Sequence, residues 1–370
     1  MKIAFLTRVD AFSKYGGDTY QLEMYCKYLE EMKHESKICF DLDVPVDFDC
    51  YILVNLDRPL ELIVYYEKLC QMNLIKKTLF LTIHHDYKII EFFEKTIRTG
   101  ILYMPLKIFN GYLKREKFKN IVRCIKYKKL RFYTFKQLFM SYSEIIRKIL
   151  IDIPLILIAD KEKEIIERDF GIIIKKYFTV YNGVDIKPVI QKDWSRRDID
   201  ILVVGRIEPR KNVLALAKLL DNSPYQVRFV GAINMNVPNY CRKFKKIIMK
   251  SNNMKYLGKK SPSEMINVYC RSKICISASW FEVASLVDLE SYAYGCNVIA
   301  STNGHTDCYL GGRINYIDPQ NMNNILLMIP NLLQNIPDSD AQQLYIKEKY
   351  TWKRSTEQLL LSVNSALNHI

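Results

Sequence analysis

The sequence contains no hydrophobic run long enough to cross a membrane, and this sets the first limit on the protein's class. No stretch of about 18 uncharged apolar residues occurs, whereas a bilayer-spanning helix needs about 20. The opening apolar run, residues 3–6, follows a lysine and is too short for the core of a secretory signal. We therefore expect a cytoplasmic protein that does not span a bilayer.

Paired cysteines, repeats and low-complexity segments are also missing. The ten cysteines are scattered without the spacing of disulfide frameworks or zinc sites, so we expect reduced cysteines in a cytoplasmic core. No internal repeat is present, which argues against a repeat architecture. The dinucleotide-binding Gly-x-Gly-x-x-Gly signature is absent from the first glycine-containing loop.

The chain does have enough length for two domains. Its 370 residues allow two domains of roughly 180 residues each, and each can bury a sizeable core. Short apolar strands alternate with helical patterns in both halves, which predicts an α/β fold with parallel sheets. We expect domains over residues 1–185 and 198–350, separated by the polar segment 186–197 with its Pro188.

Two glutamates with seven residues between them, Glu282 and Glu290, flank a predicted strand-to-helix turn. The apolar run 274–278 is strand-like, and Ser285 with Asp288 three residues later is typical of a helix N-cap and capping box. Glu282 then lies in the loop before the helix, and Glu290 lies on its second turn. The alternative is that two glutamates share this spacing by chance.

The start of that helix is an expected anion site. Backbone N–H groups near Leu286 and Val287 have no partner inside the helix, and they would face the crevice together with the N–H of Ser285. A carboxylate on each side of such a site suits a ligand that carries a phosphate and hydroxyl-rich sugars.

A second motif follows a predicted buried strand at residues 198–205. The strand leads into Arg206-Ile207-Glu208-Pro209-Arg210-Lys211-Asn212. Arg206 and Lys211 at the carboxyl end of a strand are well placed to clamp a diphosphate. Their two positive charges can take the place of a divalent cation beside such a diphosphate, so we expect no metal and no cofactor. The alternative is a solvated basic loop.

The N-terminal half begins with a similar pattern. Residues 2–7 predict a strand, and Gly16 and Gly17 precede a predicted helix for which Asp18 is the expected N-cap. The glycines allow backbone to approach a ligand closely. The alternative is a flexible first loop.

Two adjacent histidines close another predicted strand, residues 79–83. Ligands of α/β sheets bind at the carboxyl ends of strands, which makes His84 a candidate site residue. A metal site at His84 and His85 is disfavoured, because neighbouring strand residues point to opposite faces. A histidine that only packs or hydrogen-bonds is the alternative.

In combination, these motifs resemble family 4 of the retaining, nucleotide-sugar-dependent glycosyltransferases, also called group 1 glycosyltransferases. The spacing of Glu282 and Glu290 matches the family's glutamate-seven-glutamate motif, and Asn182-Gly183-Val184-Asp185 resembles its Asn-Gly-Val-Asp signature. The resemblance implies the GT-B fold, in which two Rossmann-like domains with parallel sheets face each other across a cleft. It also implies that the C-terminal helix, residues 352–370, completes the N-terminal domain.

The resemblance implies roles for the candidate residues. Arg206 and Lys211 would bind the donor's diphosphate, and His84 would contact the donor sugar. Glu282 would orient the hydroxyls of that sugar, and Glu290 would accept hydrogen bonds from the ribose. The remaining donor-binding groups would be Gly16, Gly17, Ser285, Leu286 and Val287.

The chain departs from the family at two loops. Where the family has Gly-Phe-Gly after the first glutamate, this chain has Val283-Ala284-Ser285, which keeps the N–H donors but loses the close approach that glycine allows. In the next loop, His305 and Asp307 replace a glycine and a glutamate, so we assign no ligand role there. The choice of donor and the level of activity depend on the first change.

A basic segment from Lys107 to Lys148 carries most of the excess charge. It has 13 Lys or Arg against 2 Glu, a net of +11 out of the chain's +15, interleaved with bulky apolar residues. Such a mixture favours a helix or hairpin on an anionic membrane surface. The alternatives are a solvated basic helix pair and a nucleic-acid patch, and no nucleic-acid-binding motif supports the latter.

These inferences lead to one expected function and two alternatives. We expect a retaining glycosyltransferase that moves a sugar from a nucleotide sugar to a lipid-linked or surface-polysaccharide acceptor. It would be peripherally bound to the cytoplasmic membrane face through residues 107–148 and would bind no nucleic acid. The first alternative is an epimerase-like sugar-nucleotide enzyme of the same fold. The second is a non-catalytic basic protein that binds membrane or nucleic acid.

Overall fold

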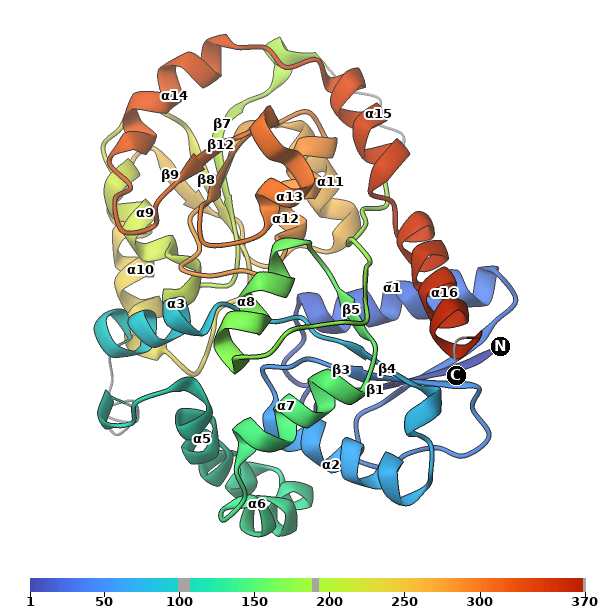
Figure 1. Cartoon of the computed structure of the whole chain (residues 1–370). Helices are drawn as coiled ribbons and strands as arrows, with labels where there is room; N and C mark the ends of the chain where they lie inside the picture. The colour runs from blue at the N-terminus through green and yellow to red at the C-terminus, as the bar shows by residue number, and fades with distance from the viewer. Residues whose placement is uncertain (99–106, 188–192, 369–370) are drawn as a thin grey trace. The chain divides into compact units, whose positions relative to one another are not determined.

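The computed structural model describes residues 1–98, 107–187 and 193–368, and the chain divides into two compact units (Figure 1). Unit 1 comprises Met1–Gly183 and Trp352–Ile370, and unit 2 comprises Val184–Thr351. Part of the expected boundary segment, residues 188–192, and the last two residues of the expected terminal helix lie outside the described residues.

Unit 1 is built on a six-stranded parallel sheet in the order β2-β1-β3-β4-β5-β6. Its strands are β1 Lys2–Leu6, β2 Glu35–Cys39, β3 Cys50–Val54, β4 Thr78–Leu81, β5 Leu155–Leu157 and β6 Tyr177–Thr179. Strands β3, β4 and β5 are buried along their whole length. Their continuous apolar runs follow from this, because helices cover both faces of such a sheet.

The helices of unit 1 connect these strands. They are α1 Gly17–Glu31, α2 Pro59–Gln71, α3 Tyr87–Phe92, α5 Tyr112–Lys126, α6 Arg131–Gln137, α7 Tyr142–Asp152, α8 Lys161–Phe170 and α16 Trp352–Asn368. Single turns are present at η1 Ile75–Lys77, η2 Phe93–Ile97 and η4 Lys128–Leu130.

The expected N-cap of α1 is wrong. Gly16 occupies the N-cap position, and Asp18 lies in the first turn. The Asp18 carboxylate is instead held by the guanidinium of Arg8, whose Nε donates to Asp18 Oδ2 at 2.7 Å. A nearly buried guanidinium binds a carboxylate more strongly than a helix N–H group does, which explains the outcome.

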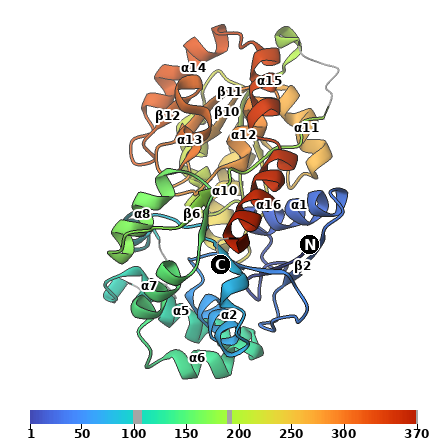
Figure 2. The same ribbon diagram turned by 45° about the vertical axis from the view of Figure 1, so that its right-hand side comes forward.

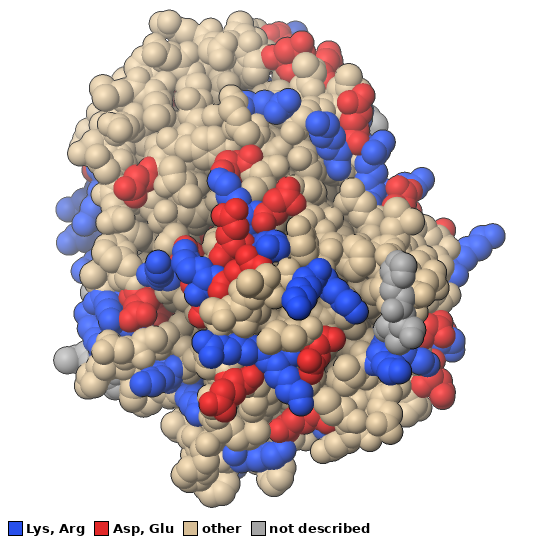
Figure 3. Space-filling model, in the orientation of Figure 1, with Lys and Arg blue, Asp and Glu red and all other residues tan. Residues whose placement is uncertain are grey.

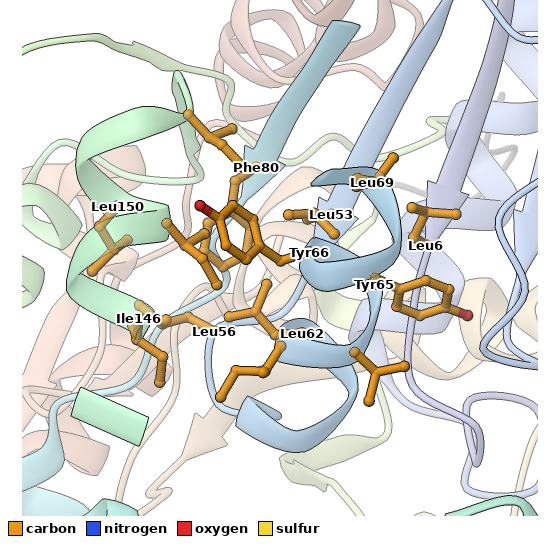
Figure 4. Close-up of a cluster of buried hydrophobic side chains, with 14 of the residues drawn as sticks. Leu6, Leu53, Leu56, Leu62, Tyr65, Tyr66, Leu69, Phe80, Ile146 and Leu150 are labelled. Atoms are coloured by element: carbon orange, nitrogen blue, oxygen red, sulfur yellow. The ribbon is translucent and has the colours of Figure 1, made fainter. Parts of the chain in front are cut away.

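The core of unit 1 lies between the sheet and helices α2 and α7 (Figure 4). Leu53 and Phe80 from neighbouring strands pack with Leu62 of α2 and Ile146 of α7. On the other side, α16 covers α1: the ring of Trp352 is buried, with its centroid 5.9 Å from that of Tyr25. Figure 2 shows α16 beside α1, although more than 300 residues separate them in sequence.

Unit 2 has a second six-stranded parallel sheet, in the order β12-β11-β10-β7-β8-β9. The strands are β7 Ile199–Val204, β8 Val227–Val230, β9 Met254–Tyr256, β10 Ser272–Ser277, β11 Asn297–Ser301 and β12 Asn315–Ile317. The predicted strands 198–205 and 274–278 are confirmed as β7 and β10, with both ends of each strand shifted by one or two residues.

The helices of unit 2 follow the same alternation. They are α9 Val213–Leu220, α10 Pro238–Lys250, α11 Pro262–Cys270, α12 Leu286–Ala293, α13 Thr306–Leu310, α14 Asn324–Gln334 and α15 Ser339–Lys349. The short turns are η5 Trp194–Arg196, η6 Pro209–Lys211 and η7 Gly311–Arg313. The expected α/β class with parallel sheets is confirmed in both units.

All ten cysteines are free thiols, and most of them are buried or half-buried. Across the described ranges, no helix combines the length and the apolar character that a membrane crossing requires.

Candidate active site

The site in unit 2 forms at the switch point of its sheet, where the order in which strands are added reverses. From β7 the chain runs to β8 and β9 on one side, and it returns to β10 on the other side of β7. Loops that follow two such strands separate and leave a crevice at the carboxyl end of the sheet, where α/β proteins bind ligands. The loop after β7 carries Arg206 to Lys211, and the loop after β10 carries Glu282.

The two loops are joined by backbone and side-chain contacts. The amide of Trp280 donates to the Arg210 carbonyl at 2.8 Å. The Lys211 ammonium forms an ion pair with one oxygen of Glu282, and Arg210 Nη1 lies 3.3 Å from the other oxygen. The structure therefore brings together Lys211 and Glu282, which lie 71 residues apart in the sequence.

Glu208 and Arg210 belong to the same cluster, and the sequence analysis gave them no role. Oε1 of Glu208 lies 3.4 Å from both Arg206 Nη2 and Arg210 Nε, and Oε2 accepts from Asn234 Nδ2 at 2.7 Å. Burial favours the neutral acid, but the cations around Glu208 lower its pKa, so it is ionised at neutral pH. The alternating charges of Arg206-Ile207-Glu208-Pro209-Arg210 were the available signal.

The cluster thus holds three cations and two carboxylates. Arg206 is the most exposed of the cations, with 41% of its side chain accessible, whereas Lys211 and Arg210 are half-buried. The net positive charge and the accessible guanidinium favour the binding of an anion.

Helix α12 begins beside these residues, as expected. Ser285 is its N-cap, and Ser285 Oγ accepts from the Asp288 amide at 3.4 Å. Within the described residues, no protein acceptor takes the N–H groups of Leu286 and Val287. Two donors at the positive end of the helix dipole are therefore available to an anion.

Two acidic groups of α12 have unusual proton affinities. Burial raises the pKa of Glu290 to about 7, although a hydrogen bond from Tyr269 Oη to Glu290 Oε2, 2.8 Å long, acts in the opposite direction. Burial likewise raises the pKa of Asp288 to about 7, against a 2.9 Å hydrogen bond from Thr306. Both carboxyl groups are therefore partly protonated near neutral pH.

The loop after β11 supports Glu282 through its backbone. The Glu282 amide donates to the Asn303 carbonyl at 3.0 Å, and the His305 amide donates to the Val283 carbonyl at 2.9 Å. Between them, a β-carbon on Gly304 would lie 3.2 Å from the β-carbon of Glu282. Glycine at this position lets the two loops approach closely, and a larger residue would push against Glu282.

The glycine loop of unit 1 is held by ion pairs. Arg8 Nη2 donates to the Lys14 carbonyl at 2.9 Å, and Arg8 also contacts Asp10 and Asp18. A β-carbon on Gly16 would lie 3.0 Å from Asp18 Oδ1, whereas one on Gly17 would meet no atom within 4 Å. A side chain at position 16 would therefore crowd the Asp18 carboxylate, whereas position 17 has open space.

His84 is fully buried between two carboxylates. Its Nδ1 lies 2.9 Å from Asp57 Oδ1, and its Nε2 lies 3.0 Å from Asp169 Oδ2. Burial favours the neutral ring, but the two carboxylates raise the pKa of His84 to about 9, so it is an imidazolium that donates from both nitrogens. A contact between His84 and a sugar would require one of these hydrogen bonds to break.

The predicted site residues are therefore divided between the units. Unit 2 places the cation–carboxylate cluster and the start of α12 around the carboxyl ends of β7 and β10. Unit 1 carries Gly16, Gly17 and His84, and their roles toward a donor remain predictions. Within the described residues, no group of three or more His, Cys, Asp and Glu is arranged to hold a metal ion.

Comparison with known proteins agrees with this geometry. Residues 189–339 match the family model of the group 1 glycosyl transferases, a segment that contains the cation–carboxylate cluster and α12. Among curated proteins, none matches the sequence of this chain.

Solved structures resemble the chain over its full length. Sucrose-phosphate synthase from Thermosynechococcus elongatus is 12% identical, with a TM-score of 0.70 and coverage of 100% of both chains. HepE from Anabaena, solved with UDP, is 13% identical, with a TM-score of 0.67 and coverage of 99% of this chain and 100% of its own. The lipopolysaccharide outer core galactosyltransferase WaaB is 16% identical, with a TM-score of 0.57 and coverage of 99% of both chains. The chain therefore has the GT-B fold.

Proposed function

We propose that this protein is a retaining glycosyltransferase of family 4 that uses a nucleoside-diphosphate sugar as its donor. The observation that carries the proposal is the joining of Arg206, Lys211 and Glu282 at the switch point of unit 2, beside the start of α12. The family match over residues 189–339 supports it, as does the UDP bound in HepE.

In the proposed donor complex, the diphosphate replaces a carboxylate as the partner of Lys211. The ammonium of Lys211 now pairs with Glu282, and a diphosphate carries more charge and more acceptor oxygens than one carboxylate. Once Lys211 turns to the diphosphate, Glu282 becomes available to accept hydrogen bonds from the sugar hydroxyls. Arg206 and the N–H groups of Leu286 and Val287 complete the anion site.

We assign the ribose to Glu290, whose carboxylate is held by Tyr269. Transfer then proceeds by front-face substitution: the bond from the anomeric carbon to the diphosphate breaks on the same face on which the acceptor oxygen bonds. The acceptor's hydroxyl proton passes to the leaving diphosphate, whose growing charge Arg206 and Lys211 stabilise. These cations supply the charge that a divalent ion would otherwise provide, so the reaction needs no metal.

The proposed acceptor is a lipid-linked or surface-polysaccharide glycan at the cytoplasmic membrane face, bound by unit 1. The galactosyltransferase WaaB, which shares the fold, is described as acting on the lipopolysaccharide outer core. The basic helices of unit 1 support an acceptor at an anionic surface.

A two-stage experiment tests the donor assignment. The purified protein is screened against nucleotide sugars by thermal shift, and each hit is assayed for sugar transfer or hydrolysis with analysis of the anomeric product. We expect a nucleotide sugar to raise the melting temperature and to give a product with retained configuration. An inverted product would contradict the retaining mechanism, and epimerised donor would favour an epimerase of the same fold. Absence of binding by every nucleotide sugar would contradict the proposed function.

A further inference from the structure

Helices α5 and α6 of unit 1 carry their apolar residues on the outside. In α5 the buried side chains include Arg115, Glu116 and Asn120, whereas 51% of Val122 and 72% of Ile125 are exposed. A helix at the surface of a globular protein normally has the opposite pattern, with apolar residues inward and polar residues outward.

Helix α6 repeats this inversion. Its buried side chains are Thr134 and Gln137, whereas 72% of Phe132 and 70% of Phe135 are exposed. Phe139, just beyond the helix, is 89% exposed. Single exposed apolar residues are common, but three exposed phenylalanines within eight residues form a patch that indicates a partner.

The inward polar face of α5 explains why the helix cannot simply turn over. Arg115 lies 3.1 Å from Glu91 and 3.5 Å from Glu94, and Lys119 also pairs with Glu94, so these contacts tie α5 to residues outside it. Breaking buried ion pairs of this kind leaves uncompensated charges, which is strongly unfavourable. The outward position of Val122 and Ile125 is therefore fixed by the fold.

The two apolar helix faces are neighbours. Arg131 Nε, at the start of α6, donates to the Cys124 carbonyl of α5 at 3.1 Å. This contact places Phe132 close to the stretch of α5 that carries Val122 and Ile125. Figures 1 and 2 both show α5 and α6 together at the lower end of unit 1, and in Figure 3 the surface over α6 is mainly tan with Lys or Arg beside it.

Cations border this surface. Lys126, Lys128, Lys129 and Arg131 are exposed, and within the described residues none of them is paired with a carboxylate. By contrast, Arg115, Lys119, Arg123 and Lys136 are paired with Glu91, Glu94, Glu116 or Glu67. The net charge of the segment therefore overstates what a partner meets, because several of its cations are already paired, but four available cations lie at residues 126–131, where α5 leads into α6.

We propose that this surface, the α5–α6 face, docks on an anionic lipid bilayer, with Phe132, Phe135 and Phe139 inserted among the acyl chains and Lys126, Lys128 and Lys129 at the headgroups. Charge complementarity supports this occupant, since bulky apolar side chains flanked by lysines are the composition of interfacial helices. The proposal rests on the proposed function for its purpose only, because docking would bring unit 1 to a membrane-borne acceptor.

Vesicle flotation measures the docking without donor or acceptor. The probe is a set of vesicles of phosphatidylglycerol and phosphatidylcholine in equal amounts, compared with pure phosphatidylcholine. We expect binding to the anionic vesicles that weakens as salt rises. The triple variant Phe132→Ser, Phe135→Ser and Phe139→Ser should lower the partition coefficient by more than about tenfold, because each phenylalanine transfers a large apolar area from water.

Matched variants of unit 2 serve as controls. Met235, Met249 and Leu327 are similarly exposed, at 80%, 79% and 75%, so their joint change to Ser removes comparable apolar surface from unit 2. The charge variant Lys126→Ser, Lys128→Ser and Lys129→Ser should release the protein from vesicles. The corresponding change of Lys243, Lys245 and Lys246 on α10 should not. Unchanged melting temperatures and nucleotide binding would show that all variants fold.

A direct measurement of insertion separates this proposal from other occupants. The variant Phe135→Trp should show fluorescence that shifts to the blue on vesicles and is quenched by brominated lipid. Equal vesicle binding by wild type and the phenylalanine variant would overturn the proposal. So would a wild-type dimer that the same variant dissociates in the absence of vesicle binding, or tighter binding to RNA than to vesicles at equal ionic strength. If vesicles bind but no nucleotide sugar is used, the docking stands and the proposed function fails.

Discussion

At the scale of single residues, the pairing of Lys211 with Glu282 is the contact that the proposed donor would replace. Without an anion, each side chain neutralises the other, and the half-buried pair avoids the cost of an unpaired charge. Arg210 and Glu208 extend the pairing to Arg206, so a bound diphosphate would meet an Arg206 that Glu208 already orients, whereas Lys211 would first turn away from Glu282. Such preorganisation favours stabilisation of the transition state, because little rearrangement remains when charge develops.

Arg206 gives the first prediction. The change Arg206→Ala should lower the transfer rate by about two to three orders of magnitude, similar to the loss of one transition-state donor. The Arg206 side chain is 41% exposed, and its ion pair in the described part of the chain is the one with Glu208, so the melting temperature should change little. The rate is measured with the donor identified by the thermal-shift screen, and the exposed Lys218→Ala in α9 is the control. Activity within threefold of wild type would remove Arg206 from the mechanism.

Glu290 gives a prediction for pH. Its raised pKa of about 7 means that the carboxyl group is increasingly protonated as pH falls below 7, and a neutral acid accepts hydrogen bonds from ribose hydroxyls less well. The KM for the donor should therefore rise between pH 8 and pH 6, while kcat changes less. The variant Glu290→Gln should have a high KM that hardly varies over this range. A wild-type KM that is flat with pH would refute this role.

At the scale of elements, the strands that are buried on both faces of a sheet were the part of the fold that the sequence predicted best. The apolar runs of β4, β7 and β10 identified these strands to within two residues, because a strand covered by helices on both faces must be apolar throughout. The start of α12 was predictable because Ser285 caps locally. The position of Asp18 was not predictable, because it is set by the ion pair with Arg8, and no local sequence pattern indicates that tertiary contact.

Helices α5 and α6 show the same limit of prediction from local sequence patterns. Residues 107–148 are a mixture of basic and apolar residues, and from this composition we predicted a role at a membrane surface for the segment. Which apolar residues face outward depends on Glu91 and Glu94, which lie outside that segment and pair with Arg115. The Arg210–Glu282 contact likewise became visible only when the loops after β7 and β10 were seen together.

His84 gives a prediction at the scale of elements, because it links three of them. It follows β4, Asp57 follows β3, and Asp169 belongs to α8. The pKa of His84 is raised from 6.5 to about 9, so the folded state holds the proton more tightly than the unfolded state does. The resulting contribution to the free energy of unfolding is fully present below pH 6.5. The free energy of unfolding should fall as pH rises through 9, by up to about 1.4 kcal/mol per pH unit for one proton.

Chemical unfolding of wild type and His84→Asn at several pH values measures this contribution. The variant should be less stable at pH 6, and its stability should depend less on pH between 6.5 and 9. Because the three elements belong to unit 1, the loss should appear in the unfolding of that unit. Parallel pH curves for the two proteins would show that the imidazolium does not link these elements.

At the scale of the whole molecule, the proposed chemistry and the proposed docking belong to different units. The cation–carboxylate cluster lies in unit 2 and the α5–α6 face in unit 1, so each can be disabled without the other. Hydrolysis of a nucleotide sugar in solution should survive loss of the phenylalanines, whereas transfer to an acceptor in vesicles should fall. This separation makes the two proposals independently testable on one protein.

The last prediction concerns the metal requirement of the proposed transfer. Arg206, Arg210 and Lys211 carry three positive charges against two negative charges on Glu208 and Glu282, and in the proposed complex Arg206 and Lys211 stabilise the charge that develops on the leaving nucleoside diphosphate. Transfer should therefore persist in saturating chelator, and added magnesium or manganese should change kcat by less than about twofold, since no step in the proposed mechanism uses a metal. The measurement compares initial rates after dialysis against chelator with those after metal is restored. Lys211→Ala provides a useful contrast: if the cluster replaces a metal, added magnesium should partly rescue this variant while leaving wild type unaffected. Complete loss of wild-type activity in chelator, restored by either ion, would show that the cluster does not suffice.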